Sequence, residues 1–191
     1  MLNSYIKTFH PADRIANSFI NIIYIIGFDD SMKPKKSRKH AHRKNNRPSW
    51  DEYWMNIVEQ VGKRSTCMRR NIGAVIVKDN IIVSTGFNGS PRGLPHCIEI
   101  GCLRDELKIP SGTMHEVCRG VHAEQNAIIR GDPLRMDGAT LYVNAKPCKI
   151  CAKMIVNAGV KRVVYLEIYP DNEGIKILRE AGIETAPHKS K

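Results

Sequence analysis

The sequence lacks the features of exported and membrane-spanning proteins. Its N-terminus has no compact basic region followed by a long apolar run and a small-residue cleavage site, which argues against a secretory signal. The most apolar stretch, 18–28, has eleven residues, whereas a transmembrane helix needs about 20. We therefore expect a cytoplasmic protein without a membrane span, whose six cysteines are reduced thiols rather than disulfides.

Acidic residues are scarce relative to basic ones, and the excess of basic residues is unevenly distributed along the chain. The net charge is +11; residues 1–47 carry ten Lys and Arg against three Asp, and the remaining 144 residues carry twenty against sixteen. Eight of the basic residues fall within 33–47, which has no aromatic side chain on which bases could stack. This composition predicts a disordered, solvated arm, and binding to nucleic acid or to an anionic surface is the weaker alternative.

The charge distribution divides the chain into an N-terminal segment, 1–46, and one domain over 47–191. The apolar stretch 18–28 predicts a packing or oligomer-contact helix. Alternatively, translation starts downstream, for example at Met32. The domain itself is long enough to bury a full core without disulfides.

Local patterns predict an α/β fold for the domain. Ser49 and Glu52 form a capping-box pattern before a helix over 52–64. The near-continuous apolar run 72–77 is typical of a strand covered on both faces. Further patterns predict helices over 122–130, 148–157 and 174–180 and strands over 81–87, 140–144, 162–166 and 183–185. A hairpin followed by alternating helices and strands indicates a three-layer α/β/α arrangement with a mixed five-stranded sheet.

Two short motifs carry the chemistry: H-A-E at 122–124 and P-C-K-I-C at 147–151. H-x-E followed by P-C-x-x-C is the signature of zinc deaminases. His122, Cys148 and Cys151 provide three zinc ligands and leave the fourth position open for water, whose pKa zinc lowers to about 7. Glu124 is then placed to shuttle a proton from that water to a substrate nitrogen.

Simpler interpretations of the second motif exist. A lone C-x-x-C also occurs in redox dithiols and in structural zinc sites, but neither has a use for H-A-E upstream. The sequence further predicts that His122 and the two cysteines lie in the first turns of their helices. Helix N-termini favour negative charge, which helps to keep the thiols ionised.

The chain resembles the cytidine deaminase superfamily and, within it, the deoxycytidylate (dCMP) deaminases. The G-F-N-G-S-P loop at 86–91 is the most discriminating element, and the other matching stretches are 65–77, 85–97, 118–128, 140–165 and 167–184. The resemblance implies a cytidine deaminase-like fold and zinc-dependent hydrolysis of dCMP to dUMP and ammonia, supplying dUMP for thymidylate synthesis. It also implies a homo-oligomer, often a hexamer, with dCTP as activator, dTTP as inhibitor and Mg²⁺ accompanying the nucleotide effector.

The resemblance assigns nucleotide contacts to three residues. Asn88 is similar to the asparagine that contacts the nucleotide sugar, and Arg70 and Tyr169 stand where the family contacts the nucleotide. A phosphate needs a cation such as Arg70. The alternatives are a solvated charge for Arg70 and a tyrosine at the edge of the core for Tyr169.

The resemblance also implies a second, structural zinc. Its ligands would be Cys67, Cys97, His115 and Cys118, a closed set that would pin the long insert 91–119. His96 and Cys102 are alternative ligands that spacing cannot exclude, and buried free thiols are the alternative to a metal site.

A second function class shares the same core motifs. The tRNA adenosine deaminases also have H-A-E and P-C-x-x-C, and the basic arm would then bind RNA. The G-F-N-G loop and the insert before His122 favour a nucleotide substrate instead. A non-catalytic zinc module is weaker still, because Glu124 would have no role in it.

Overall fold

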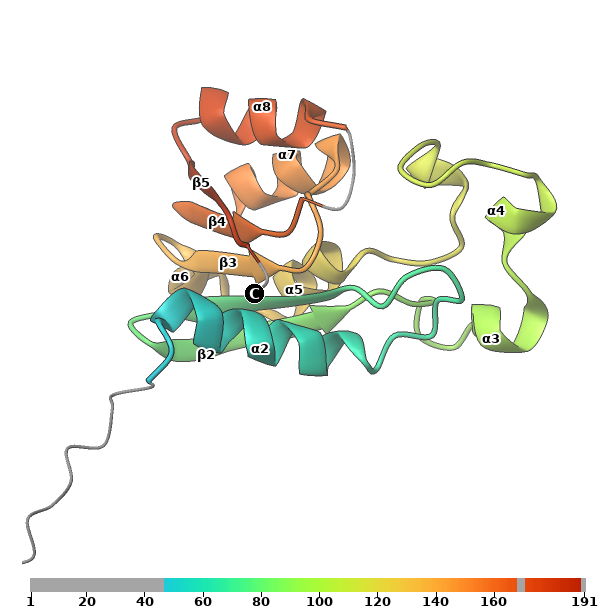
Figure 1. Cartoon of the computed structure of the whole chain (residues 1–191), viewed down its shortest axis with the longest axis horizontal. Coiled ribbons are helices and arrows are strands. Elements are labelled where there is room, and N and C mark those ends of the chain that lie inside the picture. The colour runs from blue at the N-terminus through green and yellow to red at the C-terminus, as the bar shows by residue number, and fades with distance from the viewer. Residues whose placement is uncertain (1–46, 168–170, 190–191) are drawn as a thin grey trace, which may run out of the picture. The chain divides into compact units, whose positions relative to one another are not determined.

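The computed structural model describes residues 47–167 and 171–189 (Figure 1). Residues 47–191 make up one compact unit. The interpretations of 18–28 and 33–46, and the assignment of Tyr169, lie outside the described residues. Of the helices within the described ranges, none combines the length and the apolar character needed to cross a membrane.

A mixed sheet of five strands forms the centre of the domain, in the order β2-β1-β3-β4-β5. β1 pairs antiparallel with β2 and β3, whereas β3, β4 and β5 are parallel. The strands are β1 (Gly73–Lys78), β2 (Ile81–Phe87), β3 (Thr140–Val143), β4 (Arg162–Tyr165) and β5 (Glu184–Pro187). The predicted fold class is confirmed, and the strand bounds differ from the expected ones only by the usual variation at element ends.

Helix α2 (Trp50–Gly62) covers one face of the sheet (Figure 1). Its N-cap is Ser49, whose Oγ accepts a hydrogen bond from the Glu52 N–H at 3.2 Å, as the capping pattern predicts. Trp54 and Val58 on this helix pack against the strands. The helix begins two residues earlier than expected because the cap residue directly precedes Trp50.

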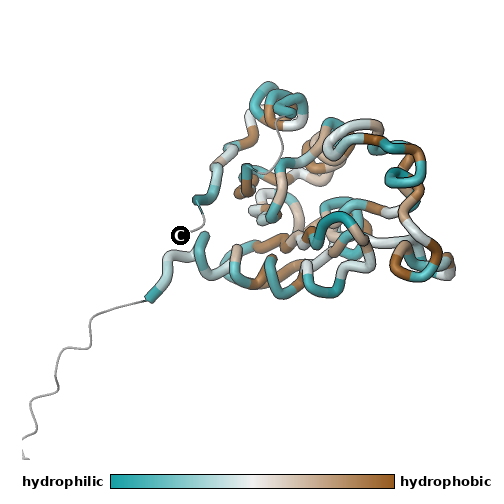
Figure 2. The backbone as a smooth tube through the Cα atoms, turned by 45° about the vertical axis from the view of Figure 1, so that its right-hand side comes forward, coloured by the Kyte–Doolittle hydropathy of each residue, from teal (hydrophilic) through white to brown (hydrophobic). Residues whose placement is uncertain are grey.

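Three longer helices cover the opposite face, where the larger core cluster lies. In β1, Ala74 and Ile76 point into this cluster, whereas Val75 and Val77 point toward α2. Burial on both faces explains the continuous apolar run of β1. Figure 2 shows hydrophobic segments, in brown, among the hydrophilic ones of the folded unit. The helices on this side are α5 (Ala123–Arg130), α7 (Lys149–Asn157) and α8 (Glu173–Glu180), with the short α6 (Pro133–Met136) beside them.

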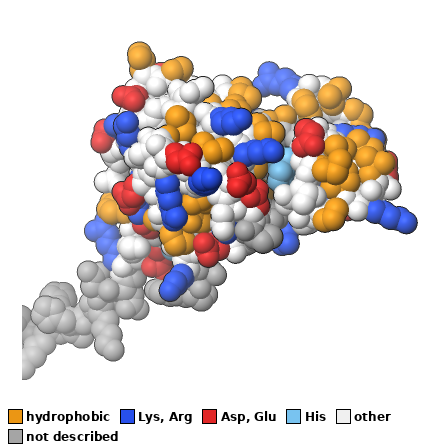
Figure 3. Space-filling view, turned by 90° about the horizontal axis from the view of Figure 1, so that it is seen from above, with side chains coloured by type: hydrophobic (Ala, Val, Ile, Leu, Met, Phe, Trp, Pro, Cys, Tyr) orange, Lys and Arg blue, Asp and Glu red, His pale blue; other side chains and the backbone are white. Residues whose placement is uncertain are grey.

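The segment between β2 and α5 projects from the sheet and has short helices that the sequence patterns do not predict (Figure 1). They are α3 (Cys97–Ile100), α4 (Leu103–Glu106) and the 3-10 turn η2 (His115–Val117). Apolar side chains gather at the right-hand end of the face in Figure 3, over this segment. The exposed ones include Leu94, Ile98, Ile100, Leu107 and Met114.

Candidate active site

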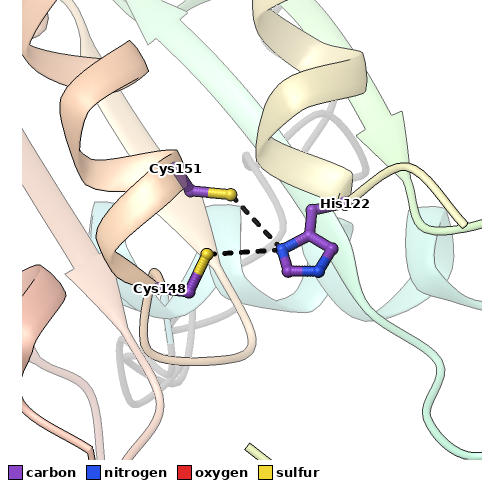
Figure 4. A group of neighbouring side chains, drawn as sticks. All are labelled: His122, Cys148 and Cys151. Carbon is purple, nitrogen blue, oxygen red and sulfur yellow. Dashed lines mark hydrogen bonds between the residues drawn. The ribbon is translucent and has the colours of Figure 1, made fainter. Parts of the chain in front are cut away.

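The structure brings His122 together with Cys148 and Cys151, although 26 residues separate the histidine from the first cysteine. The Nδ1 atom of His122 lies 3.4 Å from Sγ of Cys151 and 3.6 Å from Sγ of Cys148. All three side chains point toward one another from the starts of α5 and α7 (Figure 4). Among the described residues, this is the one group of three or more metal-binding side chains whose ligand atoms lie within 4.8 Å of one another.

These distances fit a zinc ion. With Zn–N near 2.0 Å and Zn–S near 2.3 Å, a tetrahedral centre places its nitrogen and sulfur ligands about 3.5 Å apart. The two nitrogen–sulfur distances in the structure lie on either side of this value. Two thiols and an imidazole are also donors that zinc prefers. His122, Cys148 and Cys151 would therefore hold the ion and leave one coordination position for a small molecule.

The positions of these side chains at helix starts and their mutual hydrogen bonds shift their pKa values. His122 and Cys148 are the N-cap residues of α5 and α7, one position before the first turns in which they were expected. A hydrogen bond from Cys151, together with one from His122, lowers the pKa of the Cys148 thiol to about 3 despite its burial. Burial lowers the pKa of His122, but its hydrogen bond to Cys148 and the charge of Glu124 raise it further, so that it lies above its ordinary value.

Glu124 lies in the first turn of α5 with 3% of its surface exposed. Burial raises the pKa of its carboxyl group, because the charged form loses its hydration. Its side chain also contacts Cys151 through a hydrogen bond. A buried carboxyl with a raised pKa beside a metal site is suited to accept and release a proton.

One cavity contains Glu124 and His122, and it is also lined by Arg70 and Asn88. Arg70 is exposed, and within the described ranges no ion pair of its side chain is found. The Asn88 amide, in contrast, is engaged with backbone: Oδ1 accepts from Ile72 N at 2.9 Å, and Nδ2 donates to Arg70 O at 2.9 Å. Tyr169 lies outside the described residues, and Asp171, two positions later in the sequence, lines the same cavity.

The residues predicted for a second zinc also line this cavity, but their ligand atoms do not form a close group like that of His122, Cys148 and Cys151. Cys67, Cys97, His115 and Cys118 are all in the lining, as is the alternative ligand Cys102, whereas His96 is not. No three of their ligand atoms lie within 4.8 Å of one another in the described structure. The pKa of Cys97 is raised by burial, which favours the neutral thiol. Burial lowers the pKa of His115, whose ring lies 5.1 Å edge-on from that of His122.

Sequence reasoning missed three cations that line the cavity: Arg69, Arg104 and Lys146. Lys146 directly precedes the P-C-K-I-C motif, which could have drawn attention to it; its Nζ donates to Asn172 Oδ1 at 2.8 Å. Arg104 is 8% exposed, and its Nη2 donates to the carbonyls of Pro110 and Thr113, so it holds the loop beside His115. No local pattern around Arg104 signals its burial.

Comparison with known proteins relates this geometry to a family. A model described as the cytidine and deoxycytidylate deaminase zinc-binding region matches residues 48–167. Deoxycytidylate deaminase of Schizosaccharomyces pombe is 39% identical over 140 residues, which are 72% of this chain and 44% of the yeast protein. The enzyme of the same name from Mycobacterium phage D29 is 40% identical over 124 residues, covering 62% of this chain and 95% of the phage protein.

A solved structure supports the same relationship. The dCMP deaminase of cyanophage S-TIM5, in complex with dCMP and dUMP, superposes with a TM-score of 0.58 and 30% sequence identity. The alignment covers 74% of this chain and 98% of the phage chain. The chain thus spans less than half the length of its yeast relative but nearly the whole of these phage proteins.

Proposed function

Because the chain belongs to the cytidine and deoxycytidylate deaminase family, we propose that it hydrolyses dCMP to dUMP with release of ammonia. One observation carries this proposal: the buried carboxyl of Glu124 stands beside three converging zinc donors rather than acting as a fourth. A closed structural site would use a fourth protein ligand. This arrangement instead leaves room for water with a proton acceptor next to it.

In this reaction the bound zinc and the side chain of Glu124 have separate roles. When bound, zinc supplies a Lewis acid that lowers the pKa of water to about 7. Glu124 accepts a proton from the attacking water and delivers it to the ring nitrogen next to C4. It then moves the proton of the new C4 hydroxyl to the amino group, which leaves as ammonia when the C4–N bond breaks and the carbonyl forms. Burial of Glu124 supports this role, because its raised pKa lets the carboxyl carry the proton between the two transfers.

Recognition of the nucleotide is assigned to the cavity rim. Arg70 supplies the positive charge for the phosphate, and its place in the cavity lining beside Asn88 supports this role. Asn88 shapes the sugar-binding side, and Tyr169 completes the nucleotide contacts from the segment before Asp171. The boundary of the catalytic domain is placed at residue 47, since all of these residues follow it.

A second, structural zinc at Cys67, Cys97, His115 and Cys118 is part of the proposal. Support comes from the common cavity that these side chains line, and from the need to hold a projecting insert. Metal analysis of the purified protein should give two zinc ions per chain. Cys97→Ser should reduce this to one and lower the melting temperature, and one zinc ion per wild-type chain would refute the second site.

Family resemblance extends the proposal to the cellular role. The enzyme would supply dUMP for thymidylate synthesis in the cytoplasm as a homo-oligomer, a hexamer by resemblance. dCTP would activate it and dTTP would inhibit it, with Mg²⁺ accompanying the nucleotide effector. Stimulation by dCTP at low substrate concentration, together with the mass of the particle in solution, tests these points.

A spectrophotometric deamination assay on the zinc-loaded protein tests the main proposal. It compares dCMP, dCTP, deoxycytidine, CMP and a tRNA anticodon stem-loop, with Glu124→Gln as the matched inactive control. We expect turnover of dCMP well above that of the other substrates. Turnover of the RNA alone would assign the chain to the tRNA adenosine deaminases, and no turnover of any of them would reject deamination.

A further inference from the structure

The backbone that leads into β1 lies between the ends of β2 and β3. The Asn88 N–H, just after β2, donates to Ile72 O at 3.1 Å. The Asn144 N–H, just after β3, donates to Gly73 O at 3.4 Å. These two bonds extend the antiparallel ladders on both sides of β1 beyond the ends of its neighbours.

The side chain of Asn88 continues the ladder on one side. It accepts from Ile72 N and donates to Arg70 O, both at 2.9 Å. A side-chain amide has the same carbonyl acceptor and N–H donor as a peptide group. Asn88 therefore acts as an additional peptide unit beside residues 70–72.

The side chain of Asn144 does the same on the other side, displaced by one residue. Its Oδ1 accepts from Gly73 N at 2.9 Å, and its Nδ2 donates to Asn71 O at 3.0 Å. The two asparagines thus satisfy alternate backbone groups along 70–73. We call Asn88 and Asn144 together the amide clamp.

The two halves of the clamp face different surroundings. Arg70, Ile72 and Asn88 line the cavity that contains Glu124. Asn71, Gly73 and Asn144 are not among the described residues that line it, in agreement with the alternation of side chains along an extended segment. Asn144 consequently holds the cavity rim from behind, without reaching the space where a substrate binds.

Packing leaves this segment little room to shift toward α2. A Cβ atom on Gly73 would lie 2.2 Å from the Val58 carbonyl oxygen and 2.7 Å from Gly62 N, so the two backbones are already in close contact. Loss of the Asn144 amide would leave the Asn71 carbonyl and the Gly73 N–H without these partners. The segment would then relax toward the cavity, which moves Arg70 and Ile72.

We propose that Asn144 is a positioning residue for the nucleotide, which acts through the amide clamp by holding Arg70 at the cavity rim. The inference rests on the proposed function, in which Arg70 meets the phosphate. The side-chain hydrogen bonds of the clamp go to the backbone of 70–73 and not to α5 or α7, the helices that carry Glu124 and Cys151. Loss of the clamp should therefore weaken binding of the substrate phosphate while leaving the chemical step intact.

A double-mutant cycle with Asn144→Ala and Arg70→Gln tests this. Asn144→Ala should raise the KM for dCMP about tenfold with kcat unchanged, and should change the KM for deoxycytidine, which has no phosphate, much less. In the Arg70→Gln background the same substitution should have almost no further effect on kcat/KM for dCMP. Asn157→Ala at the exposed end of α7 is the control and should match the wild type.

Other outcomes would overturn the inference. Equal KM increases for dCMP and deoxycytidine, additive effects with Arg70→Gln, or a lowered melting temperature with an unchanged KM would make Asn144 a structural residue only. Asn144→Thr keeps a hydroxyl donor on a residue that favours strands, and it serves if the alanine variant does not fold; its KM should lie between those of wild type and Arg70→Gln. Failure of the wild type to deaminate dCMP would instead reject the proposed function.

Discussion

Gly86 on β2 lies in close contact with the backbone of α5, the helix that carries Glu124. A Cβ atom at this position would lie 2.2 Å from the Ala123 carbonyl oxygen and 2.4 Å from Ala127 N, both in the backbone of α5. Contacts this short require the helix and the strand to separate by about 1 Å. Gly86→Ala therefore moves Glu124 relative to the metal donors on α7.

The helix cannot avoid the added methyl by sliding along the strand. The Ser84 hydroxyl donates to Ala127 O at 2.8 Å, and Asn126 Nδ2 donates to Phe87 O at 2.8 Å, so α5 is tied to β2 on both sides of Gly86. Overpacking of this kind costs about 1–3 kcal/mol of unfolding free energy. Displacement of a catalytic group by about 1 Å can lower the rate about 100-fold.

We therefore expect Gly86→Ala to lower kcat for dCMP about 100-fold. The assay combines steady-state kinetics with zinc content and thermal unfolding. Gly182→Ala is the control: its φ of +75° strains a side chain, but no atom lies within 4 Å of the new Cβ. It should lose about 1 kcal/mol of stability and keep its kcat. Wild-type kcat in a folded, zinc-loaded Gly86→Ala protein would refute the argument that this contact positions Glu124.

Three further predictions concern other parts of the chain. Glu124→Gln should keep its zinc and its melting temperature while kcat falls about 1000-fold, and near-normal turnover would exclude the proton shuttle. Asp51 accepts two hydrogen bonds from Arg162, both at 2.8 Å, and these lower the pKa of its carboxyl below the ordinary 3.8. Its stabilisation is therefore complete above that value and is lost as pH falls through the lowered pKa. Asp51→Asn should cost about 2 kcal/mol at neutral pH in urea unfolding, with a difference from wild type that shrinks below about pH 4; a constant difference would contradict this. Deletion of residues 1–46 should leave dCMP turnover unchanged, and its loss in a folded protein would show that the domain boundary is wrong.

The grouping of His122, Cys148 and Cys151 could be predicted from the sequence, and so could the place of Glu124 at the same helix start as His122. Imidazole, thiol and carboxyl groups in the pattern H-x-E and P-C-x-x-C combine chemistry with short spacing, and a spacing of a few residues fixes which side chains share a helix start. The continuous apolar run of β1 likewise predicts burial on both faces, because alternation along a strand is local. These signals come from residues that are close together in the sequence, so they can be recognised without knowledge of the fold.

The tertiary structure decided which distant groups meet. Asn88 and Asn144 are separated by more than fifty residues, and no pattern in either region reveals that their amides hold the same backbone segment. Burial of Arg104 within the insert is equally invisible, because its partners are backbone carbonyls, which every residue has. The type of a side chain determines which hydrogen bonds it can form. The packing of strands and helices determines which donor and which acceptor come within reach of each other.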